Sequence, residues 1–264
     1  MVTKKEFTEK ILTEYPRMEK TDKFKFACHP GVSCFNQCCN DVNIFLTPYD
    51  IIRVKNRLGI TSGEFLEKYT LLPIEENLKH PIIMLRMDEE TKNCPFVGKE
   101  GCTVYEDRPW SCRMFPVGVA SPKEVENNDD KEFFFLLKED VCKGFDGGNE
   151  WTVEEWMKNQ GVDEYVELGD MFKDVSLHEY FTGTKGVEPV KLEMFYMACY
   201  DLDKFRTFVF GSTFLKRFKV DAERIEKIKK DDTELLKFGF DFIRFSLFGE
   251  KTLQLCDEYS QQTR

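Results

Sequence analysis

Residues 94–116 read CPFVGKEGCTVYEDRPWSCRMFP, and this stretch decides what kind of domain the chain can form. Three cysteines, Cys94, Cys102 and Cys112, are separated by seven and then nine residues, and the segments between them are polar and contain glycine and proline. Prolines stiffen such loops because they remove backbone freedom and a hydrogen-bond donor. The stretch predicts a loop-rich domain that is organised around its thiols.

The cysteine pattern continues on both sides of this stretch. A group with the spacing Cys28-x5-Cys34-x3-Cys38-Cys39 precedes it, and Cys142 follows it. Clustered thiolates suit zinc and iron, and a tetrahedral site takes four of them. We therefore expect a metal centre whose candidate ligands, called the octet below, are Cys28, Cys34, Cys38, Cys39, Cys94, Cys102, Cys112 and Cys142. The alternative is that some of these thiols are ordinary buried residues, since free cysteine is often buried.

The spacing of the octet narrows the choice of metal centre. The sequence has no C-x2-C knuckle of the kind found in zinc fingers and ribbons, and neither ferredoxin spacing is present. A radical-SAM motif that started at Cys34 would need a cysteine where Asp41 stands. Adjacent residues usually point their side chains apart, so Cys38 and Cys39 are expected to serve different metals or to include only one ligand. A polynuclear centre accommodates both, which favours an iron–sulfur cluster or iron over zinc.

Three other side chains near the cysteines are candidates for a supporting role. Arg108 and Arg113 flank Cys112, where cationic groups would lower thiol pKa values and offset the negative charge of a thiolate centre. The alternative for Arg108 is a surface ion pair with Glu106 or Asp107. His29 is either a further ligand or a hydrogen-bonded loop residue.

Capping chemistry and hydrophobic spacing place the helices and strands. Helices are expected where Thr or a Thr-Pro pair opens an apolar periodic run, at residues 3–16, 47–58, 61–72 and 152–160. Residues 81–89 are expected to form a short strand, and residues 133–137 are expected to form either a strand or one buried helical turn. Helical spacing of Phe and Leu then recurs over 193–210, 222–228 and 233–248.

The fold class that follows is mainly α: a loop-rich cysteine-cluster domain with little β structure over residues 1–148, and a helical carboxy-terminal region over residues 149–264. The stripe of Phe238, Phe242, Phe245 and Phe248 is expected to be core rather than a cofactor-binding surface. Cys199 and Cys256 each stand alone in a helical apolar pattern, so we expect them to be small buried core residues.

Charge and composition exclude several classes of function. The 264 residues carry a formal net charge of −10, which opposes binding to nucleic acid and to anionic membranes. Residues 1–10 contain no apolar signal region, and no run of apolar residues is long enough to span a membrane. We expect a cytoplasmic protein, in which stable disulfides are rare, whose partner is a protein or a small molecule.

Taken together, the motifs resemble a known family. The Cys34-x3-Cys38-Cys39 group, Thr47-Pro48-x-Asp50-Ile51, Phe65-x3-Tyr69, Cys94-Pro95-Phe96, the turn at residues 101–105, Arg108-Pro109-x2-Cys112-Arg113-x-Phe115-Pro116 and Cys142 are similar to those of the YkgJ-type cysteine-cluster proteins. The resemblance covers roughly residues 24–148. It implies that the octet chelates zinc or iron.

Three functions are consistent with this resemblance. The first is a metal-binding protein that holds iron or zinc. The second is a metal-dependent protein-modifying enzyme, since one branch of the family resembles flagellin lysine N-methylases, which are associated with an iron–sulfur centre and S-adenosylmethionine. The third is an interaction module in which the metal is structural and the carboxy-terminal helices dock a partner. No catalytic residue is indicated by the sequence.

Overall fold

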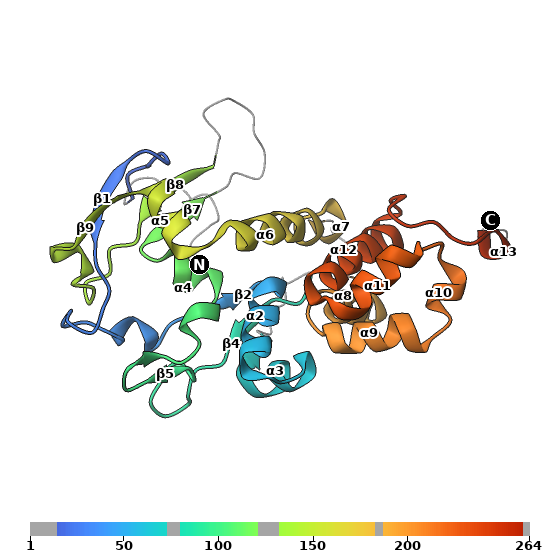
Figure 1. Ribbon diagram of the computed structural model, residues 1–264, viewed down its shortest axis with the longest axis horizontal. Coiled ribbons are helices and arrows are strands. Elements are labelled where there is room, and N and C mark those ends of the chain that lie inside the picture. Colours follow the sequence, from blue (N-terminus) through green and yellow to red (C-terminus); the bar gives the residue numbers. More distant parts are fainter. Residues whose placement is uncertain (1–14, 73–79, 121–131, 183–186, 261–264) are drawn as a thin grey trace. The chain divides into compact units, whose positions relative to one another are not determined.

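The computed structural model describes residues 15–72, 80–120, 132–182 and 187–260 (Figure 1). The chain forms two compact units that interleave along the sequence. Unit 1 comprises Met1–Val42, Glu90–Thr103 and Trp110–Asp163, and unit 2 comprises Asn43–Glu89, Val104–Pro109 and Glu164–Arg264. The division into a cysteine-cluster domain over residues 1–148 and a helical region over residues 149–264 stays a prediction.

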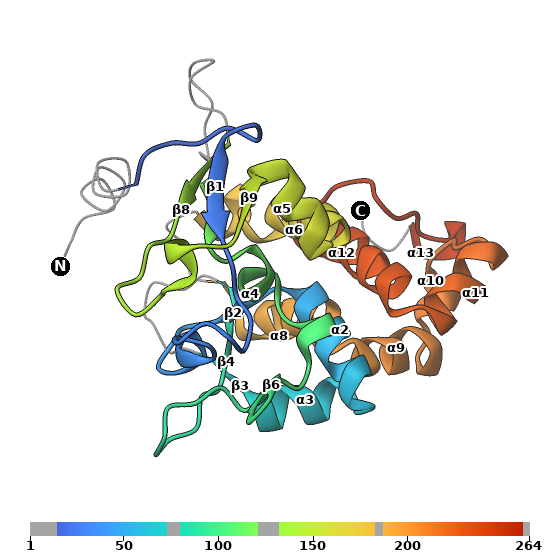
Figure 2. The ribbon, with the colours of Figure 1, turned by 60° about the vertical axis from the view of Figure 1, so that its left-hand side comes forward.

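Unit 1 is built from short elements joined by turns. Its strands form three antiparallel pairs in the described residues, β1 with β9, β5 with β6 and β7 with β8. Strands β1 and β9 lie side by side in both ribbon views although they are far apart in the sequence (Figures 1 and 2). The elements are β1 (Lys23–Phe26), η1 (Gln37–Cys39), β5 (Val97–Gly98), β6 (Gly101–Cys102), α4 (Trp110–Met114), β7 (Val117–Ala120), β8 (Phe133–Leu136), η3 (Gly144–Asp146), β9 (Asn149–Thr152) and α5 (Val153–Gln160).

An aromatic cluster forms the core of unit 1. Strand β1 alternates lysine with phenylalanine, so its two phenylalanines face inward together. Phe26 is 2% exposed and contacts three other rings, with centroid distances of 5.9 Å to Phe115, 5.2 Å to Phe145 and 5.5 Å to Trp156. This ring therefore ties together segments that follow Cys112 and Cys142 and one that precedes Cys28.

Unit 2 is mainly helical. Helix α12 packs along α8, α11 and α2, and α3 packs against α9. The elements are β2 (Phe45–Leu46), α2 (Pro48–Leu58), α3 (Ser62–Tyr69), β3 (Thr70–Leu71), β4 (Ile83–Leu85), η2 (Tyr105–Asp107), α6 (Asp163–Ser176, whose first residue belongs to unit 1), α7 (Glu179–Thr182), α8 (Pro189–Cys199), α9 (Leu202–Gly211), α10 (Phe214–Arg217), α11 (Ala222–Lys230), α12 (Asp232–Phe248) and α13 (Asp257–Ser260).

Three helices begin at the threonine N-caps that the sequence predicts, and each cap is a capping box in the structure. In α2, the Thr47 hydroxyl accepts from the Asp50 amide while the Asp50 carboxylate accepts from the Thr47 amide. Helices α3 and α5 begin in the same way at Thr61 and Thr152. Each such cap satisfies amide groups that the first helical turn leaves without partners. These three predictions are confirmed, although α3 ends at Tyr69 and the chain continues as strand β3.

The three-stranded sheet of unit 2, in the order β2-β4-β3, has one buried and one exposed face. Leu46 and Ile83 pair across the buried face and are 4% and 0% exposed. On the other face Phe45 and Leu71 flank Met84 in register, and they are 56% and 45% exposed. The alternation follows from the two-residue period of a strand. Strand β4 confirms the short strand expected within residues 81–89.

Two of the four phenylalanines in the stripe of α12 lie in the core. Phe238 and Phe242 are 0% and 5% exposed, whereas Phe245 and Phe248 are half-buried and pack on Phe218 and His178. A β-carbon at Gly239 would lie 2.3 Å from the Ala198 carbonyl oxygen, so the glycine allows α12 to pass close to α8. The expected core role therefore holds for Phe238 and Phe242.

The helical run expected over 193–210 is in fact two helices. Helix α8 ends at Cys199, and α9 starts after Asp201, whose carboxylate accepts from the Lys204 amide at 3.4 Å. The same carboxylate accepts from the Ser62 hydroxyl at 2.8 Å, which joins this helix start to α3. An N-terminal aspartate competes with helix continuation because it satisfies the amides of a new first turn.

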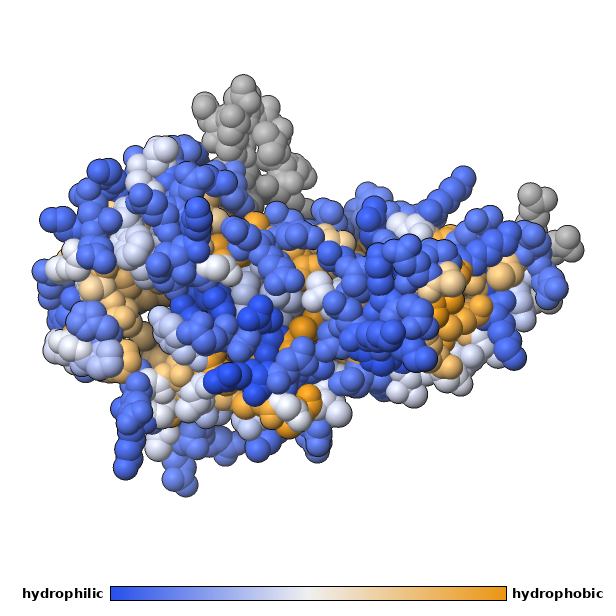
Figure 3. All heavy atoms as spheres, viewed as in Figure 1, coloured by the Kyte–Doolittle hydropathy of each residue, from blue (hydrophilic) through white to orange (hydrophobic). Residues whose placement is uncertain are grey.

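The structure confirms the predicted fold class, mainly α with small sheets only. The helix expected over residues 3–16 falls almost wholly outside the described residues, and strand β8 confirms the strand expected at 133–137. None of the described helices is long and apolar enough to cross a lipid bilayer. The face shown in Figure 3 is largely hydrophilic with small apolar patches, in keeping with the charged composition.

Candidate metal centre

All eight cysteines of the octet lie in unit 1, whereas Cys199 and Cys256 lie in unit 2. The octet is carried by three loop segments, 28–39, 94–102 and 142–144, and by helix α4. Hydrogen bonds within unit 1 connect the three loop segments to each other, and the backbone therefore determines which thiols are neighbours.

The first segment is a series of tight turns. Backbone hydrogen bonds run from the Gln37 amide to the Cys34 carbonyl at 2.9 Å and from the Cys39 amide to the Asn36 carbonyl at 3.0 Å. Asn36 adopts a left-handed conformation with φ of 68°, which asparagine tolerates better than most residues. The turns bring Cys34 close to the 3-10 helix η1, which carries Cys38 and Cys39.

The second segment pairs directly with the first. The Cys94 amide donates to the Cys39 carbonyl at 2.7 Å, and the Asn40 side-chain amide donates to the Thr91 carbonyl at 2.8 Å. The short β5–β6 hairpin then places Cys102 opposite Val97, whose amide donates to the Cys94 carbonyl at 3.1 Å. Cys39, Cys94 and Cys102 are thus neighbours through main-chain contacts.

The third segment meets the first at a sulfur atom. The Lys143 amide donates to Cys34 Sγ at 3.0 Å, and the Ala27 amide donates to the Gly144 carbonyl at 3.0 Å. A β-carbon at Gly144 would lie 2.5 Å from the Phe26 ring and 2.7 Å from the Ala27 carbonyl oxygen, so only glycine fits this approach. The turn after Cys142 is therefore held against the residues around Cys28 and Cys34.

Helix α4, which carries Cys112, is anchored to helix α5. The Arg113 guanidinium donates to the Gln160 carbonyl at 2.6 Å, and the Trp156 indole donates to the Met114 carbonyl at 3.1 Å. The first contact places a cation at the carboxy-terminal end of α5, where it is electrostatically favourable. Both contacts are buried and fix the helix on which the Cys112 thiol is exposed.

The thiols also influence one another electrostatically. The pKa of Cys38 is lowered to about 7 by a hydrogen bond from the Cys39 thiol. The pKa of Cys39 is raised by that same bond, by burial and by the charges of Cys38, Cys94 and Cys112. Burial raises the pKa of Cys94, and the charge of Cys102 raises it further. Burial also raises the pKa of Cys142, to which the charges of Cys34 and Cys38 add.

Adjacent Cys38 and Cys39 lie in the 3-10 helix η1, in which successive side chains are about 120° apart rather than on opposite faces. The expectation that they serve different metals, or that only one of them is a ligand, stays a prediction.

No member of the octet is a buried core residue. Cys28, Cys38 and Cys112 are exposed, and the other five are half-buried. Cys199, by contrast, is 0% exposed, and burial raises its pKa. Cys256 is half-buried, so the expectation of a core residue holds for Cys199 only; its amide joins a short bridge by donating to the Arg217 carbonyl at 2.8 Å. The alternative of ordinary buried thiols therefore does not describe the octet.

The thiols are neighbours without enclosing a common point. Among the residues that the structure describes, no three His, Cys, Asp or Glu side chains are arranged to hold a metal ion. The donor set nevertheless fits a thiophilic metal in its chemistry, because all eight candidate ligands are thiols and none of them is buried.

The predicted supporting residues lie in different places. Arg108 belongs to unit 2, is 8% exposed, stacks 3.8 Å from the Tyr105 ring centroid and donates to the Tyr105 carbonyl. Asp107 accepts a hydrogen bond from Arg53 at 2.7 Å. A role for Arg108 or Arg113 beside the metal stays a prediction. His29 accepts a hydrogen bond from the Gly31 amide at 3.1 Å, as a loop histidine does.

Sequence reasoning missed two features of this site. The Lys143 amide is a main-chain group, so no residue type reveals it. The position of Phe26 between three ligand segments depends on pairing of β1 with β9, which no local pattern indicates.

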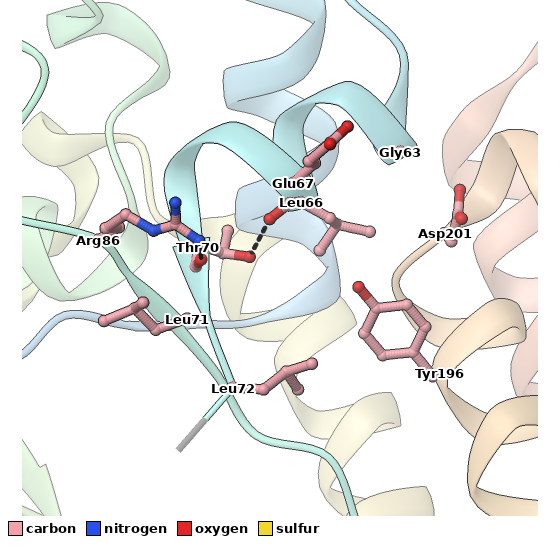
Figure 4. Close-up of a pocket in the computed structure, with 9 residues that line it drawn as sticks. All are labelled: Gly63, Leu66, Glu67, Thr70, Leu71, Leu72, Arg86, Tyr196 and Asp201. Carbon is pink, nitrogen blue, oxygen red and sulfur yellow. Dashed lines mark hydrogen bonds between the residues drawn. The ribbon is translucent and has the colours of Figure 1, made fainter. Parts of the chain in front are cut away.

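A cavity in unit 2 is separate from the octet. It has a volume of about 440 Å³ and lies between α3, β3, β4 and the residues around Tyr196 and Asp201 (Figure 4). The Thr70 hydroxyl donates to the Leu66 carbonyl at its wall. None of the eight cysteines lines it.

The fold and site define a cysteine-cluster protein with small sheets and a helical carboxy-terminal half. Residues 27–143 match the family model CxxCxxCC, whose description is "Putative zinc- or iron-chelating domain". This match confirms the resemblance to a cysteine-cluster family over these residues, and the matched stretch contains the whole octet. No curated protein and no solved structure matches the chain.

Proposed function

We propose that the chain is a metal-binding protein whose octet holds iron, as an iron–sulfur cluster, or zinc. The observation that carries the proposal is the set of hydrogen bonds that joins the three cysteine-bearing loops within one compact unit. Such contacts bring donors together before a metal arrives, and the family match supports metal binding in general.

Iron is favoured over zinc on two grounds. The sequence lacks zinc knuckles, and polynuclear centres accommodate adjacent cysteines such as Cys38 and Cys39 more readily than single zinc ions do. When bound, an iron–sulfur cluster supplies one-electron transfer and a zinc ion supplies folding energy. Cys34, Cys38, Cys39, Cys94, Cys102 and Cys112 are the principal ligands, with Cys28 and Cys142 completing the octet. A reducing compartment such as the cytoplasm would keep these thiols available.

The test is metal analysis of full-length protein purified without oxygen. Iron together with acid-labile sulfide is expected; iron without sulfide, or zinc, would identify the alternative centres. Protein that contains neither metal and takes up neither from solution under reducing conditions would refute the proposal.

A further inference from the structure

The contacts of unit 1 divide the octet into two groups rather than one. Main-chain contacts join Cys39, Cys94 and Cys102, and a different set of contacts joins the Cys142 turn to Cys34 and to the strand that leads to Cys28. We propose that the octet forms two adjoining four-thiolate sites, one of Cys28, Cys34, Cys38 and Cys142 and the other of Cys39, Cys94, Cys102 and Cys112. This division rests on the proposed function and goes beyond it by assigning each thiol to a site.

The first site is organised by the turn after Cys142. The Lys143 amide donates to Cys34 Sγ at 3.0 Å, which brings the adjoining residue Cys142 close to Cys34. The Ala27 amide bonds to the Gly144 carbonyl and thereby holds the chain at Cys28 beside the same turn. Cys38 is the remaining thiol of the first segment and is assigned to this site as its fourth ligand.

The second site is organised by the β5–β6 hairpin. Cys94 bonds to the Cys39 main chain at 2.7 Å, and Cys102 lies across the hairpin from Val97. Cys112, on helix α4 of the same unit, is assigned to this site as its fourth ligand.

The dipeptide Cys38-Cys39 is where the two sites meet. In the 3-10 helix η1, consecutive side chains leave the axis in directions about 120° apart. One thiol can therefore complete each set of four, and neighbouring sites can share this turn. The division also gives each site the four thiolates that tetrahedral coordination requires.

The experiment is a titration of the reduced, metal-free, full-length protein with Co²⁺ in the absence of oxygen, followed by thiolate-to-metal charge-transfer absorption. Two equivalents are expected for the unchanged protein. Cys34→Ser and Cys142→Ser should each lose one equivalent, and so should Cys94→Ser and Cys102→Ser. The double variant Cys34→Ser/Cys142→Ser should still bind one equivalent, whereas Cys34→Ser/Cys94→Ser should bind none tightly. Cys256→Ser is the control and should bind two.

A single equivalent in the unchanged protein, or loss of all metal in any single variant, would overturn the two-site division while leaving the proposed function intact. Absence of Co²⁺ binding in the unchanged protein would overturn the two four-thiolate sites, and the proposed function itself would be refuted only if the protein also took up neither iron nor zinc. Because a variant can fail to fold, the unchanged protein should also be loaded with ¹¹³Cd²⁺. Two cadmium resonances are expected in its NMR spectrum, and one resonance at saturation would contradict the division.

Discussion

The ten thiols of this chain differ in what surrounds them, and this difference sets what each can do. Cys199 is enclosed by apolar side chains, where burial opposes the thiolate that metal binding needs. Cys112 is exposed on a short helix that two buried hydrogen bonds anchor. Cys256 is half-buried in unit 2, away from any member of the octet along the chain and in a different compact unit.

Replacement of Cys112 should therefore differ in effect from replacement of Cys256. Cys112→Ser is expected to lose metal, because serine is a poor ligand for a thiophilic ion. Cys256→Ser is expected to keep its metal content unchanged. Elemental analysis of both proteins, purified side by side without oxygen, checks the prediction. The opposite pattern would show that the thiols are wrongly divided into ligands and non-ligands.

Two glycines three residues apart give a matched test of the Cys142 turn. Gly144→Ala would place a β-carbon 2.5 Å from the Phe26 ring, so it should destabilise the protein by about 1–3 kcal/mol and weaken metal binding. A β-carbon at Gly147 meets nothing within 4 Å, and Gly147→Ala should change stability by less than about 0.5 kcal/mol. Chemical denaturation and metal titration of the two variants would decide. Equal stability and equal metal binding in the two variants would mean that the Cys142 turn can shift to accommodate the added β-carbon.

At the scale of the element, the helix starts could be predicted because their signals are local. The capping boxes at Thr47, Thr61 and Thr152 lie within four residues of sequence and reappear as hydrogen bonds in the structure. The break between α8 and α9 was missed because apolar spacing continues through Asp201, although an aspartate is itself an N-cap signal. The pairing of β1 with β9 joins residues more than a hundred positions apart and leaves no local trace.

The candidate site was predictable in composition but not in arrangement. The sequence indicates which residue type gathers there, and the structure adds which thiols are neighbours. The hydrogen bonds that place these thiols beside one another come mostly from the main-chain amides of Lys143, Cys94 and Ala27. Because a main-chain amide is chemically the same in nearly every residue, the sequence does not indicate which amides form these bonds.

Strand β1 offers a test of how packing supports the metal centre. Phe24 and Phe26 are both buried on the same face, but Phe26 also contacts Phe115 and Phe145, which follow ligand cysteines. Phe26→Leu and Phe24→Leu should each destabilise the protein by roughly 1–3 kcal/mol, less than truncation to alanine would. Phe26→Leu alone should also weaken metal affinity, by about tenfold or more.

The readouts for this pair are the thermal midpoint of the metal-free protein and competition with a chelator for the metal. Equal loss of affinity in both variants would mean that Phe26 acts only through general stability. A normal affinity in Phe26→Leu would show that the ligand segments hold their positions without this ring.

At the scale of the whole molecule, the interleaved units give metal removal a defined signature. The chain crosses between the units several times, yet the octet is confined to unit 1. Because ligands order the segments that carry them, removal of metal should loosen unit 1 first.

Hydrogen exchange measures this loosening segment by segment. Chelation of the metal should speed amide exchange in residues 27–42, 90–103 and 142–146, and helix α12 should keep its protection because its core contacts involve no thiolate of the octet. Exchange that is unchanged everywhere, or that rises equally in α12, would contradict the prediction.

The hydrogen bond from the Lys143 amide to Cys34 Sγ belongs to the peptide chain itself. An alanine scan would pass over it, since every side chain at this position leaves the donor in place. Replacement of the amide by an ester, or Lys143→Pro, removes the N–H while the thiol remains. Hydrogen bonds to sulfur tune the reduction potentials of iron–sulfur centres. Removal of the Lys143 N–H would therefore shift the potential of such a centre while every cysteine ligand remains.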